Sequence, residues 1–291
     1  MLNRLIILFI IFNFSCLAQE QKKIEIHGHR GFRGKYPENT LTAFKEAAKE
    51  GVDYIELDVI ISKDSQVVVS HEPWFNATTC SYPNGKTVKK LKQGNLHRLN
   101  YSEIRNYDCG KRGNKKFPQQ AKIAEYKPLL SEVIGTMELF CRENNLPSIH
   151  YNIEIKNNAL GDWKYHFEPK ITAELVYDVL KKYDINERIL IQSFDVRSLK
   201  AIHQLNNKLK LGLLVTNFRS VNFNIKKLGF TPYSYNPALK ICKKSTIIQA
   251  HNLGCKVIVW TVDSEKEMKR ILMIDADGFI TDYPNIANKL R

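Results

Sequence analysis

The sequence lacks low-complexity segments and internal repeats of fixed period, and its 291 residues include only six cysteines. Without low-complexity segments, and with 43% hydrophobic and 25% charged residues, extended disorder is not expected away from the chain ends. No group of histidines and cysteines has the spacing of a zinc site, which disfavours zinc as a cofactor. What remains is an ordinary globular chain, long enough for one large α/β domain or two smaller ones.

Residues 1–18 differ from the rest of the chain. Arg4 is followed by the apolar run Leu5–Phe12, and the small residue Ala18 ends the segment. A basic start, a short apolar stretch and a small final residue are typical of a secretory signal, and the stretch is short for a membrane span. We therefore expect cleavage after Ala18 and export of the mature protein, either to the periplasm or as a secreted protein.

The cysteines bear on the same question of compartment. A lipid anchor on Cys16 is a less favoured alternative, because Asn13 stands where that signal has an aliphatic residue; a buried N-terminal strand is another. Without residues 1–18, five cysteines are left, so at least one thiol stays unpaired. Cys80 and Cys109 lie in a polar, loop-rich stretch and are the predicted disulfide of an exported protein. The others lie in apolar segments and are expected in the core: Cys141, Cys242 and Cys255.

Short apolar runs alternate with helical patterns along most of the chain. Several runs are apolar at successive positions, as in Val257–Val259, which is typical of strands buried on both faces. Strands followed by helices at this spacing pair in parallel, and about eight such units favour an α/β fold of the TIM (β/α)8 type over an open sheet. The expected strands are 24–27, 54–61, 67–70, 151–155, 188–192, 211–215, 257–260 and 278–281.

Two features interrupt the barrel pattern. Too few residues join the strand at 54–61 to the strand at 67–70 for a crossover helix, so a hairpin is expected there. Residues 72–127 are rich in Gly, Pro, Asn and Lys and are interpreted as a loop-rich insertion after the third strand. The barrel domain is thus expected to span residues 19–291, with this insertion inside it.

The positive charge of the chain, +14 in total, gathers in this insertion. Residues 72–127 contain twelve Lys and Arg against four Asp and Glu. Such an excess attracts anions over long range. It suits a phosphate-bearing small molecule or peripheral contact with an anionic membrane, and no nucleic acid is expected; the alternative is that the lysines only keep the chain soluble. The sequence gives no indication of the oligomeric state.

Polar residues gather where the predicted strands end, and in a barrel these ends line the active site. Glu56 and Asp58 are two residues apart on one strand, so both side chains leave the same face. Carboxylates this close repel one another unless a cation or a shared proton lies between them. Glu154, from another strand, supplies a third carboxylate. Three oxygen ligands on rigid strands suit one hard divalent cation, Ca²⁺ or Mg²⁺; the alternative is a solvent-facing acidic pair.

Two histidines, His29 and His71, follow predicted strands and begin loops. Two histidines can divide the work of acid and base near neutral pH, so both are candidate catalytic residues. Arg30 can stabilise charge on phosphoryl oxygens, and Lys156 can add a second positive charge, although Lys156 is also compatible with a surface position at a strand end. Four other histidines are expected to be structural: His97, His166, His203 and His251.

These residues fall within blocks that occur in a fixed order. The blocks are His29-Arg30-Gly31, Pro37-Glu38-Asn39-Thr40, Ile55-Glu56-Leu57-Asp58-Val59, Val67-Val68-Val69 with His71, Ile153-Glu154-Ile155-Lys156, Ser193-Phe194, Trp260-Thr261-Val262 and 277–284. Their order, over nearly all of the chain after residue 18, resembles that of the glycerophosphodiester phosphodiesterases, barrels related to phosphoinositide-specific phospholipase C.

The resemblance implies a TIM barrel, one bound divalent cation, and hydrolysis of glycerophosphodiesters to glycerol 3-phosphate and an alcohol. It implies catalysis by His29 and His71, a phosphate contact by Arg30, and packing of Trp260 against the glycerol moiety. Glu72 departs from the family pattern, which has Asp after the second histidine, so its role in orienting that histidine is open. The implied metal ligands are Glu56, Asp58 and Glu154.

Two other functions compete with this interpretation. Related barrels share the two-histidine, carboxylate-metal layout, so a phospholipase D-like activity on lysolipids or sphingolipids is the main alternative. Non-enzymatic binding of an anionic polymer or membrane is the other. Inactive barrels generally lose catalytic residues, and none is missing from these blocks, which favours an enzyme.

Overall fold

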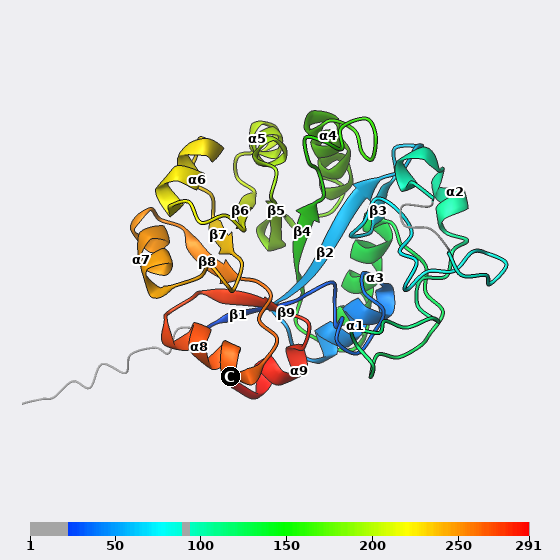
Figure 1. The fold of residues 1–291 in the computed structure, drawn as a ribbon, viewed down its shortest axis with the longest axis horizontal. Helices are drawn as coiled ribbons and strands as arrows, with labels where there is room; N and C mark the ends of the chain where they lie inside the picture. The colour runs from blue at the N-terminus through cyan, green and yellow to red at the C-terminus, as the bar shows by residue number, and fades with distance from the viewer. Residues whose placement is uncertain (1–22, 89–93, 291) are drawn as a thin grey trace, which may run out of the picture.

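The computed structural model describes residues 23–88 and 94–290, which fold as a TIM barrel (Figure 1). Eight parallel strands form a closed ring in which β2 pairs with β1 on one side and with β4 on the other. The other strands follow in sequence order to β9, which pairs with β1. The barrel strands are β1 (Glu25–Gly28), β2 (Tyr54–Ile61), β4 (His150–Ile155), β5 (Ile189–Ser193), β6 (Lys210–Val215), β7 (Ser234–Pro237), β8 (Lys256–Val259) and β9 (Gly278–Thr281). The predicted fold class is confirmed.

The third strand in the sequence, β3 (Val67–Val69), lies outside the ring. It runs antiparallel to β2, with Val59 opposite Val69, and so forms the predicted hairpin. Because the short link holds no crossover helix, the parallel neighbour of β2 comes later in the chain, as β4. The insertion therefore extends from a hairpin and not from a barrel strand.

The sequence does not predict the strand that completes the ring, β7, or the helix before it. The segment Ser234-Tyr235-Asn236-Pro237 has no apolar run, and Asn and Pro are depleted in strands. Tyr235 packs in the core, whereas Asn236 points inward and its Nδ2 donates to Oε1 of Gln192 at 2.9 Å. Contacts inside the barrel thus outweigh strand propensity here, and the expected count of eight had included β3 in place of β7.

Helices connect the strands and surround the ring, as Figure 1 shows. They are α1 (Leu41–Lys49), α2 (Tyr101–Ile104), α3 (Leu130–Glu143), α4 (Pro169–Leu180), α5 (Val196–Leu205), α6 (Val221–Leu228), α7 (Lys244–Asn252), α8 (Glu265–Met273) and α9 (Pro284–Ala287), with 3-10 turns at Leu96–Arg98, Asn186–Arg188 and Asn288–Leu290. Helix α2 belongs to the insertion, and the others form the outer layer.

The start of α1 matters for the site. Thr40 caps the helix because its side chain accepts a hydrogen bond from the Ala43 N–H, and the helix begins at Leu41. Asn39 precedes this cap and lies outside the helix. Asn39 has a φ of 58° and its Nδ2 donates to Oδ2 of Asp58 at 2.8 Å, so it serves the barrel interior and not the helix.

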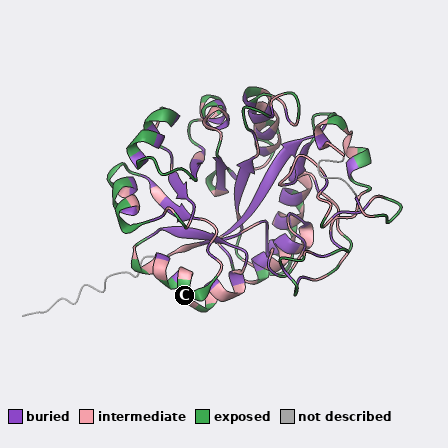
Figure 2. Cartoon of the chain, viewed as in Figure 1, coloured by how far each residue is buried: buried purple, intermediate pink, exposed green. Residues whose placement is uncertain are grey.

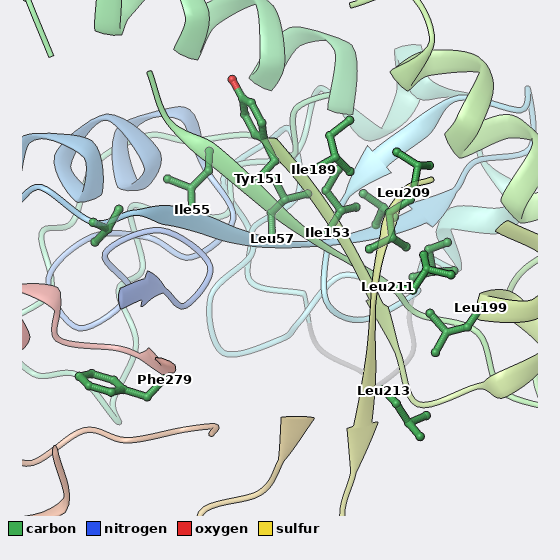
Figure 3. Close-up of a cluster of buried hydrophobic side chains, with 14 of the residues drawn as sticks. Ile55, Leu57, Tyr151, Ile153, Ile189, Leu199, Leu209, Leu211, Leu213 and Phe279 are labelled. Carbon is green, nitrogen blue, oxygen red and sulfur yellow. The ribbon is translucent and has the colours of Figure 1, made fainter. Parts of the chain in front are cut away.

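The hydrophobic core lies between the ring of strands and the helices. On β2, Ile55, Leu57 and Val59 belong to it, while the alternate residues Glu56 and Asp58 face the inside of the ring. Figure 2 shows the strands buried almost throughout, with exposed residues gathered on the outer faces of the helices. Figure 3 shows part of this core, labelled at Ile55, Leu57, Tyr151, Ile153, Ile189, Leu199, Leu209, Leu211, Leu213 and Phe279. Inside the ring, polar side chains lie beside a small apolar cluster of Tyr54, Leu190, Ile258 and Ile280.

The insertion packs a small apolar cluster against the β2–β3 hairpin and contains one pair of adjacent cysteines. In the structure Cys80 and Cys109 are paired, so the predicted pair fits the fold. Whether the native protein is oxidised there stays a prediction. The small cluster consists of Ile60, Val68, Phe75, Cys80, Val88, Leu96 and Ile104. The remaining cysteines after residue 18 are buried free thiols, as expected: Cys141, Cys242 and Cys255.

Residues 1–18, with the predicted secretory signal and Cys16, lie outside the described residues. Within residues 23–88 and 94–290, no helix has the length and apolar character needed to cross a bilayer.

Candidate active site

A cavity of about 210 Å³ opens at the carboxyl ends of the barrel strands. It is lined by every predicted site residue except Asp58, which is 1% exposed and lies against them. The lining residues are His29, Arg30, Arg33, Glu56, His71, Glu154, Lys156, Gln192, Phe194, Leu214, Trp260, Thr261 and Ile280. Side chains from both ends of the sequence thus meet in one place, as expected for the catalytic end of a barrel.

Strand register explains why three carboxylates converge. Glu56 and Asp58 lie on the inner face of β2, and Asp58 is the direct partner of Glu154 on β4. One ligand oxygen from each of the three side chains lies within 4.8 Å of the others, and all three are buried. This is the one group of three or more potential metal ligands within residues 23–88 and 94–290. It contains no His or Cys, so its chemistry suits a hard cation.

The carboxylates cannot all be ionised cheaply without a cation. Burial raises the pKa of Glu56 well above its usual value, and the neighbouring charges of Asp58 and Glu154 raise it further. Burial also raises the pKa of Glu154. For Asp58, burial acts in the same direction, but nearby positive groups outweigh it and lower the pKa. Oδ1 of Asp58 is buried with no hydrogen-bond partner among the described residues, which leaves it available as a ligand.

Polar neighbours hold the two β2 carboxylates in place. The backbone N–H of Arg30 donates to Oε2 of Glu56 at 2.9 Å, and Nε2 of Gln192 donates to its Oε1 at 3.2 Å. Asn39 donates to Oδ2 of Asp58, while its own Oδ1 accepts from the Asp58 N–H at 3.2 Å. Such partners fix the orientation of would-be metal ligands.

Lys156 is one of two cations beside the carboxylates. Its Nζ lies 2.6 Å from Oε1 of Glu154 and 3.6 Å from Oδ1 of Asp58. Nε of Arg30 also lies 3.3 Å from Oδ2 of Asp58. Sequence could not reveal this contact, because it depends on how the loop after β1 folds back over β2. Two cations therefore offset part of the negative charge in the absence of a metal.

His29 is oriented by a carboxylate. Its Nδ1 lies 2.6 Å from Oδ1 of Asp282, which leaves Nε2 as the ring nitrogen open to a ligand in the cavity. The pairing follows from strand register, because Gly28 on β1 is opposite Thr281 on β9 and each of the two residues comes next in its chain. Burial lowers the pKa of His29, although the Asp282 charge opposes the shift. His29 is thus held in its neutral form at neutral pH.

His71 has a similar partner from its own loop. Its Nδ1 lies 3.0 Å from Oε1 of Glu72, so Glu72 reaches the histidine even though it is longer than the Asp of the family pattern. Burial raises the pKa of Glu72, but the hydrogen bond and charge of His71 outweigh it and lower the pKa. Nearby, Nζ of Lys127 donates to Oγ of Ser70 at 2.9 Å, and burial lowers the pKa of this lysine. The loop after β3 is thus tied to the end of the insertion.

Two arginines share one carboxylate at the cavity wall. Arg30 donates from Nη1 to Oε1 of Glu38 at 2.8 Å, and Arg33 donates from Nε to Oε2 at 2.6 Å. Both arginines line the cavity, so this contact fixes two positive groups at its wall. Glu38 therefore acts by positioning the arginines.

Two aromatic residues, Trp260 and Phe194, also line the cavity. Nε1 of Trp260 donates to the Asn236 carbonyl at 2.8 Å, and the Phe194 ring meets the Trp260 ring edge-on at 5.4 Å between centroids. The hydrogen bond holds the indole in place beside the polar cluster. Trp260 and Thr261 also border a second, larger groove of about 550 Å³ beyond the cavity.

Several residues of the site are absent from the sequence-based set. Asp282 has a readable signal, since it follows the last predicted strand just as His29 follows the first. Phe194 carries the same signal after the strand at 188–192. Arg33, Lys127 and Asn236 carry none, because each reaches the site through a loop or a strand that the sequence does not predict.

Comparison with known proteins agrees with the geometry. The model of the glycerophosphoryl diester phosphodiesterase family matches residues 29–286. The chain is 32% identical over 270 residues to a glycerophosphodiester phosphodiesterase from Bacillus altitudinis, covering 92% of this chain and 98% of that protein. It is 28% identical over 309 residues to lysophospholipase D GDPD1 from Homo sapiens, covering 97% and 91%.

A solved structure shares the fold. The Oleispira antarctica phosphodiesterase OLEI02445, in complex with the product sn-glycerol-3-phosphate, superposes with a TM-score of 0.72 at 21% identity, covering 92% of this chain and 97% of that one. At this identity the likeness shows the fold alone, whereas the family match extends over almost the whole barrel. The chain therefore belongs to the glycerophosphoryl diester phosphodiesterase family and is an enzyme, a phosphoric diester hydrolase.

Proposed function

We propose that the enzyme hydrolyses glycerophosphodiesters to glycerol 3-phosphate and an alcohol, using one divalent cation and two histidines. The observation that carries the proposal is the shared cavity: two histidines, each held at Nδ1 by a carboxylate, face the same space as three converging carboxylates. Acid, base and charge stabilisation are then within reach of one bound phosphodiester.

The acidic group fits a cation. Its three carboxylates are close and buried, and one oxygen of Asp58 has no hydrogen-bond partner among the described residues, which supports ligation by Glu56, Asp58 and Glu154. Oxygen ligands alone favour Ca²⁺ or Mg²⁺ over zinc. When bound, the cation would polarise the phosphate and lower the pKa of a coordinated hydroxyl.

The two histidines would move the protons. His29 is held neutral by burial, so its Nε2 suits the base that takes a proton from the attacking oxygen. A new P–O bond then forms as the P–O bond to the alcohol breaks, and His71 would protonate the departing oxygen. The attacker is either water or the neighbouring glycerol hydroxyl. In the second case a cyclic phosphate forms first and water opens it, so detection of that intermediate separates the two routes.

The remaining cavity residues would bind the substrate. Arg30 and Lys156 lie where they can meet the non-bridging phosphoryl oxygens, with Arg30 fixed by Glu38. Trp260 offers an apolar wall to the glycerol carbons. The cavity of about 210 Å³ is smaller than a site for a drug-sized ligand, which suits the glycerol phosphate half of the substrate.

One observation favours a second candidate, a phospholipase D-like activity on lysolipids. The larger groove shares Trp260 and Thr261 with the cavity and contains Ala238 and Leu239, so an apolar chain has somewhere to lie. The human relative is named a lysophospholipase D, which supports the same idea. Non-enzymatic anion binding is not favoured, because the acid, base and metal-ligand positions are all filled.

Export is also part of the proposal. It rests on the signal-like residues 1–18 and is consistent with the Cys80–Cys109 pair, since disulfides persist in oxidising compartments. N-terminal sequencing of the mature protein from separated cell fractions tests it. A start at Gln19 in the periplasm or medium is expected, whereas an intact Met1 in the cytoplasm contradicts it.

The decisive assay for activity compares two substrates, glycerophosphocholine and a lysophosphatidylcholine, with and without chelator. We expect glycerol 3-phosphate and choline from the first substrate, with turnover lost in chelator and in Glu154→Gln. Glu143→Gln, an exposed acidic residue on α3, is the matched control and should keep full activity. Turnover of the lysolipid alone would favour the second candidate, and turnover of neither would overturn both.

A further inference from the structure

Four large apolar side chains are exposed in loops at the end of the barrel where the cavity opens. In the described part of the chain, Leu160 is 93% exposed, Phe218 86%, Trp163 59% and Phe194 41%. They lie in the loops that follow β4, β5 and β6, which are neighbours in the ring. All three loops leave the carboxyl ends of their strands, where the cavity opens. We call these four residues the apolar rim.

The apolar rim differs from the other exposed apolar residues. The remaining large ones in the described chain lie singly on or just after outer helices: Leu139, Leu205, Phe223, Ile248, Leu253 and Met273. Single exposed apolar residues are normal, whereas several gathered round an active site mark an interaction surface. Phe194 ties the rim to the chemistry, because it lines the cavity and packs on Trp260.

Positive charge flanks the rim. Lys164 and Arg219 lie in the rim loops, which also contain Asp162 and Asp195, so the excess of positive charge near the rim comes from the insertion. The loop after β4 also touches the basic insertion: Nδ2 of Asn95 donates to the Lys164 carbonyl at 2.7 Å, and Trp74 meets Tyr165 edge-on at 5.5 Å. The insertion, residues 72–127, has twelve Lys and Arg against four Asp and Glu. Apolar side chains beside cations match an anionic lipid surface. The apolar side chains insert at the boundary of the acyl chains, and the cations contact the anionic headgroups.

We propose that the apolar rim inserts into an anionic membrane surface and so presents the cavity to glycerophosphodiesters held in that surface. The inference rests on the proposed function and adds that the substrate is held in a membrane surface when it is hydrolysed. A lipid surface is the occupant that fits, because it supplies substrate to an opening that the patch borders through Phe194. A protein seated there would close that opening.

Vesicle sedimentation tests the proposal with the mature chain. Wild type should bind vesicles containing phosphatidylserine more tightly than vesicles of phosphatidylcholine alone, and high salt should weaken the binding. Leu160→Ala with Phe218→Ala should lower the partition coefficient at least about tenfold, since each side chain loses its buried apolar area. Leu139→Ala with Met273→Ala removes similar apolar surface away from the rim and should leave binding unchanged.

Two activity readouts separate this proposal from the function itself. The rim variant should hydrolyse soluble glycerophosphocholine at the wild-type rate, yet lose at least about tenfold in rate on lysolipid embedded in anionic vesicles. If wild type does not bind the vesicles, or if the rim variant binds as well as wild type, the proposal is wrong while the soluble assay still reports the proposed function. It is equally wrong if sizing shows a dimer that the rim substitutions dissociate, because the rim would then be an interface between two copies of the chain.

Discussion

Replacing Glu56 by Gln separates the charge of the acidic cluster from its shape. Glu56 is buried, and its pKa is raised by burial and by the charges of Asp58 and Glu154. In the metal-free enzyme the neutral form of Glu56 is therefore favoured relative to an exposed carboxyl. Gln imitates this protonated form but cannot become an anionic ligand, so the variant should fold as well as the metal-free wild type and fail to bind the cation.

The expected effect of the cation on stability can be estimated from the repulsion it relieves and from its binding. Two carboxylates within 4.8 Å repel by about 3 kcal/mol at an effective dielectric constant of about 20. A cation at a hundred times its dissociation constant stabilises the fold by about 2.7 kcal/mol. For a domain of this size each kcal/mol moves the Tm by about 2–4 °C, so saturating cation should raise the wild-type Tm by roughly 5–11 °C. In Glu56→Gln the rise should be close to zero.

The pH dependence has a definite sign. Because the folded-state pKa of Glu56 is raised, folding retains a proton that the unfolded chain releases. This contribution to the stability of the metal-free enzyme is complete below the unfolded pKa and is lost as the pH rises through the folded pKa. Cation binding must displace the same proton, so cation affinity should increase with pH in that range. In Glu56→Gln the stability of the metal-free enzyme should lack the part of its pH dependence that Glu56 contributes.

Differential scanning fluorimetry after exhaustive dialysis against chelator, with and without added Ca²⁺ or Mg²⁺, measures all of these quantities. Glu143→Gln is again the control and should behave as wild type. An equal rise in Tm for wild type and Glu56→Gln would show that any bound cation lies elsewhere, and the assignment of the cluster would fail. A large loss of stability in metal-free Glu56→Gln would show that the carboxyl is ionised there, contrary to the stated direction of its pKa.

Three further predictions concern the histidines and the insertion. His29→Ala and His71→Ala should each lower kcat by roughly 10²–10⁴-fold while cation binding persists. His203→Ala on α5 is the control and should change kcat little. A near-wild-type kcat in either site variant would contradict the two-histidine scheme. Asp282→Asn should lower kcat by about 10²-fold, because His29 loses the carboxylate that orients it. It should also move the acidic limb of the kcat/KM pH profile to lower pH, because the Asp282 charge raises the His29 pKa. An unshifted limb would argue against the pairing of His29 with Asp282. Cys80→Ser with Cys109→Ser should cost about 3.6 kcal/mol for a 29-residue separation. Peptide mapping that finds both native thiols free would contradict the disulfide.

The sequence predicts the barrel because most strands are buried on both faces and so appear as apolar runs. The exception is β7, whose inward residue Asn236 hydrogen-bonds to Gln192 inside the ring. Such a strand is stabilised by polar contacts to its neighbours, and these leave no local pattern. The β2–β3 hairpin is predictable for the opposite reason, since its link is too short for a helix.

The sequence predicts those residues of the site that lie at the carboxyl ends of the barrel strands. That rule finds Glu56, Glu154 and both histidines, and the structure brings them into one cavity. It does not find the cross-strand partners. The contact between His29 and Asp282 requires the register of β1 against β9, and the contact between Arg30 and Asp58 requires the path of a loop. Reactive groups can thus be expected from sequence, whereas the groups that orient them depend on tertiary structure.

Phosphorus-31 NMR of glycerophosphocholine turnover tests the central claim, metal-dependent release of glycerol 3-phosphate, most directly. Enzyme dialysed against chelator should leave the diester signal unchanged. Adding one equivalent of Ca²⁺ or Mg²⁺ per chain should convert it to glycerol 3-phosphate, directly or through a transient cyclic phosphate, and Glu154→Gln should remain inactive under both conditions. Undiminished turnover in excess chelator, or phosphocholine as the phosphorus-containing product, would contradict the account.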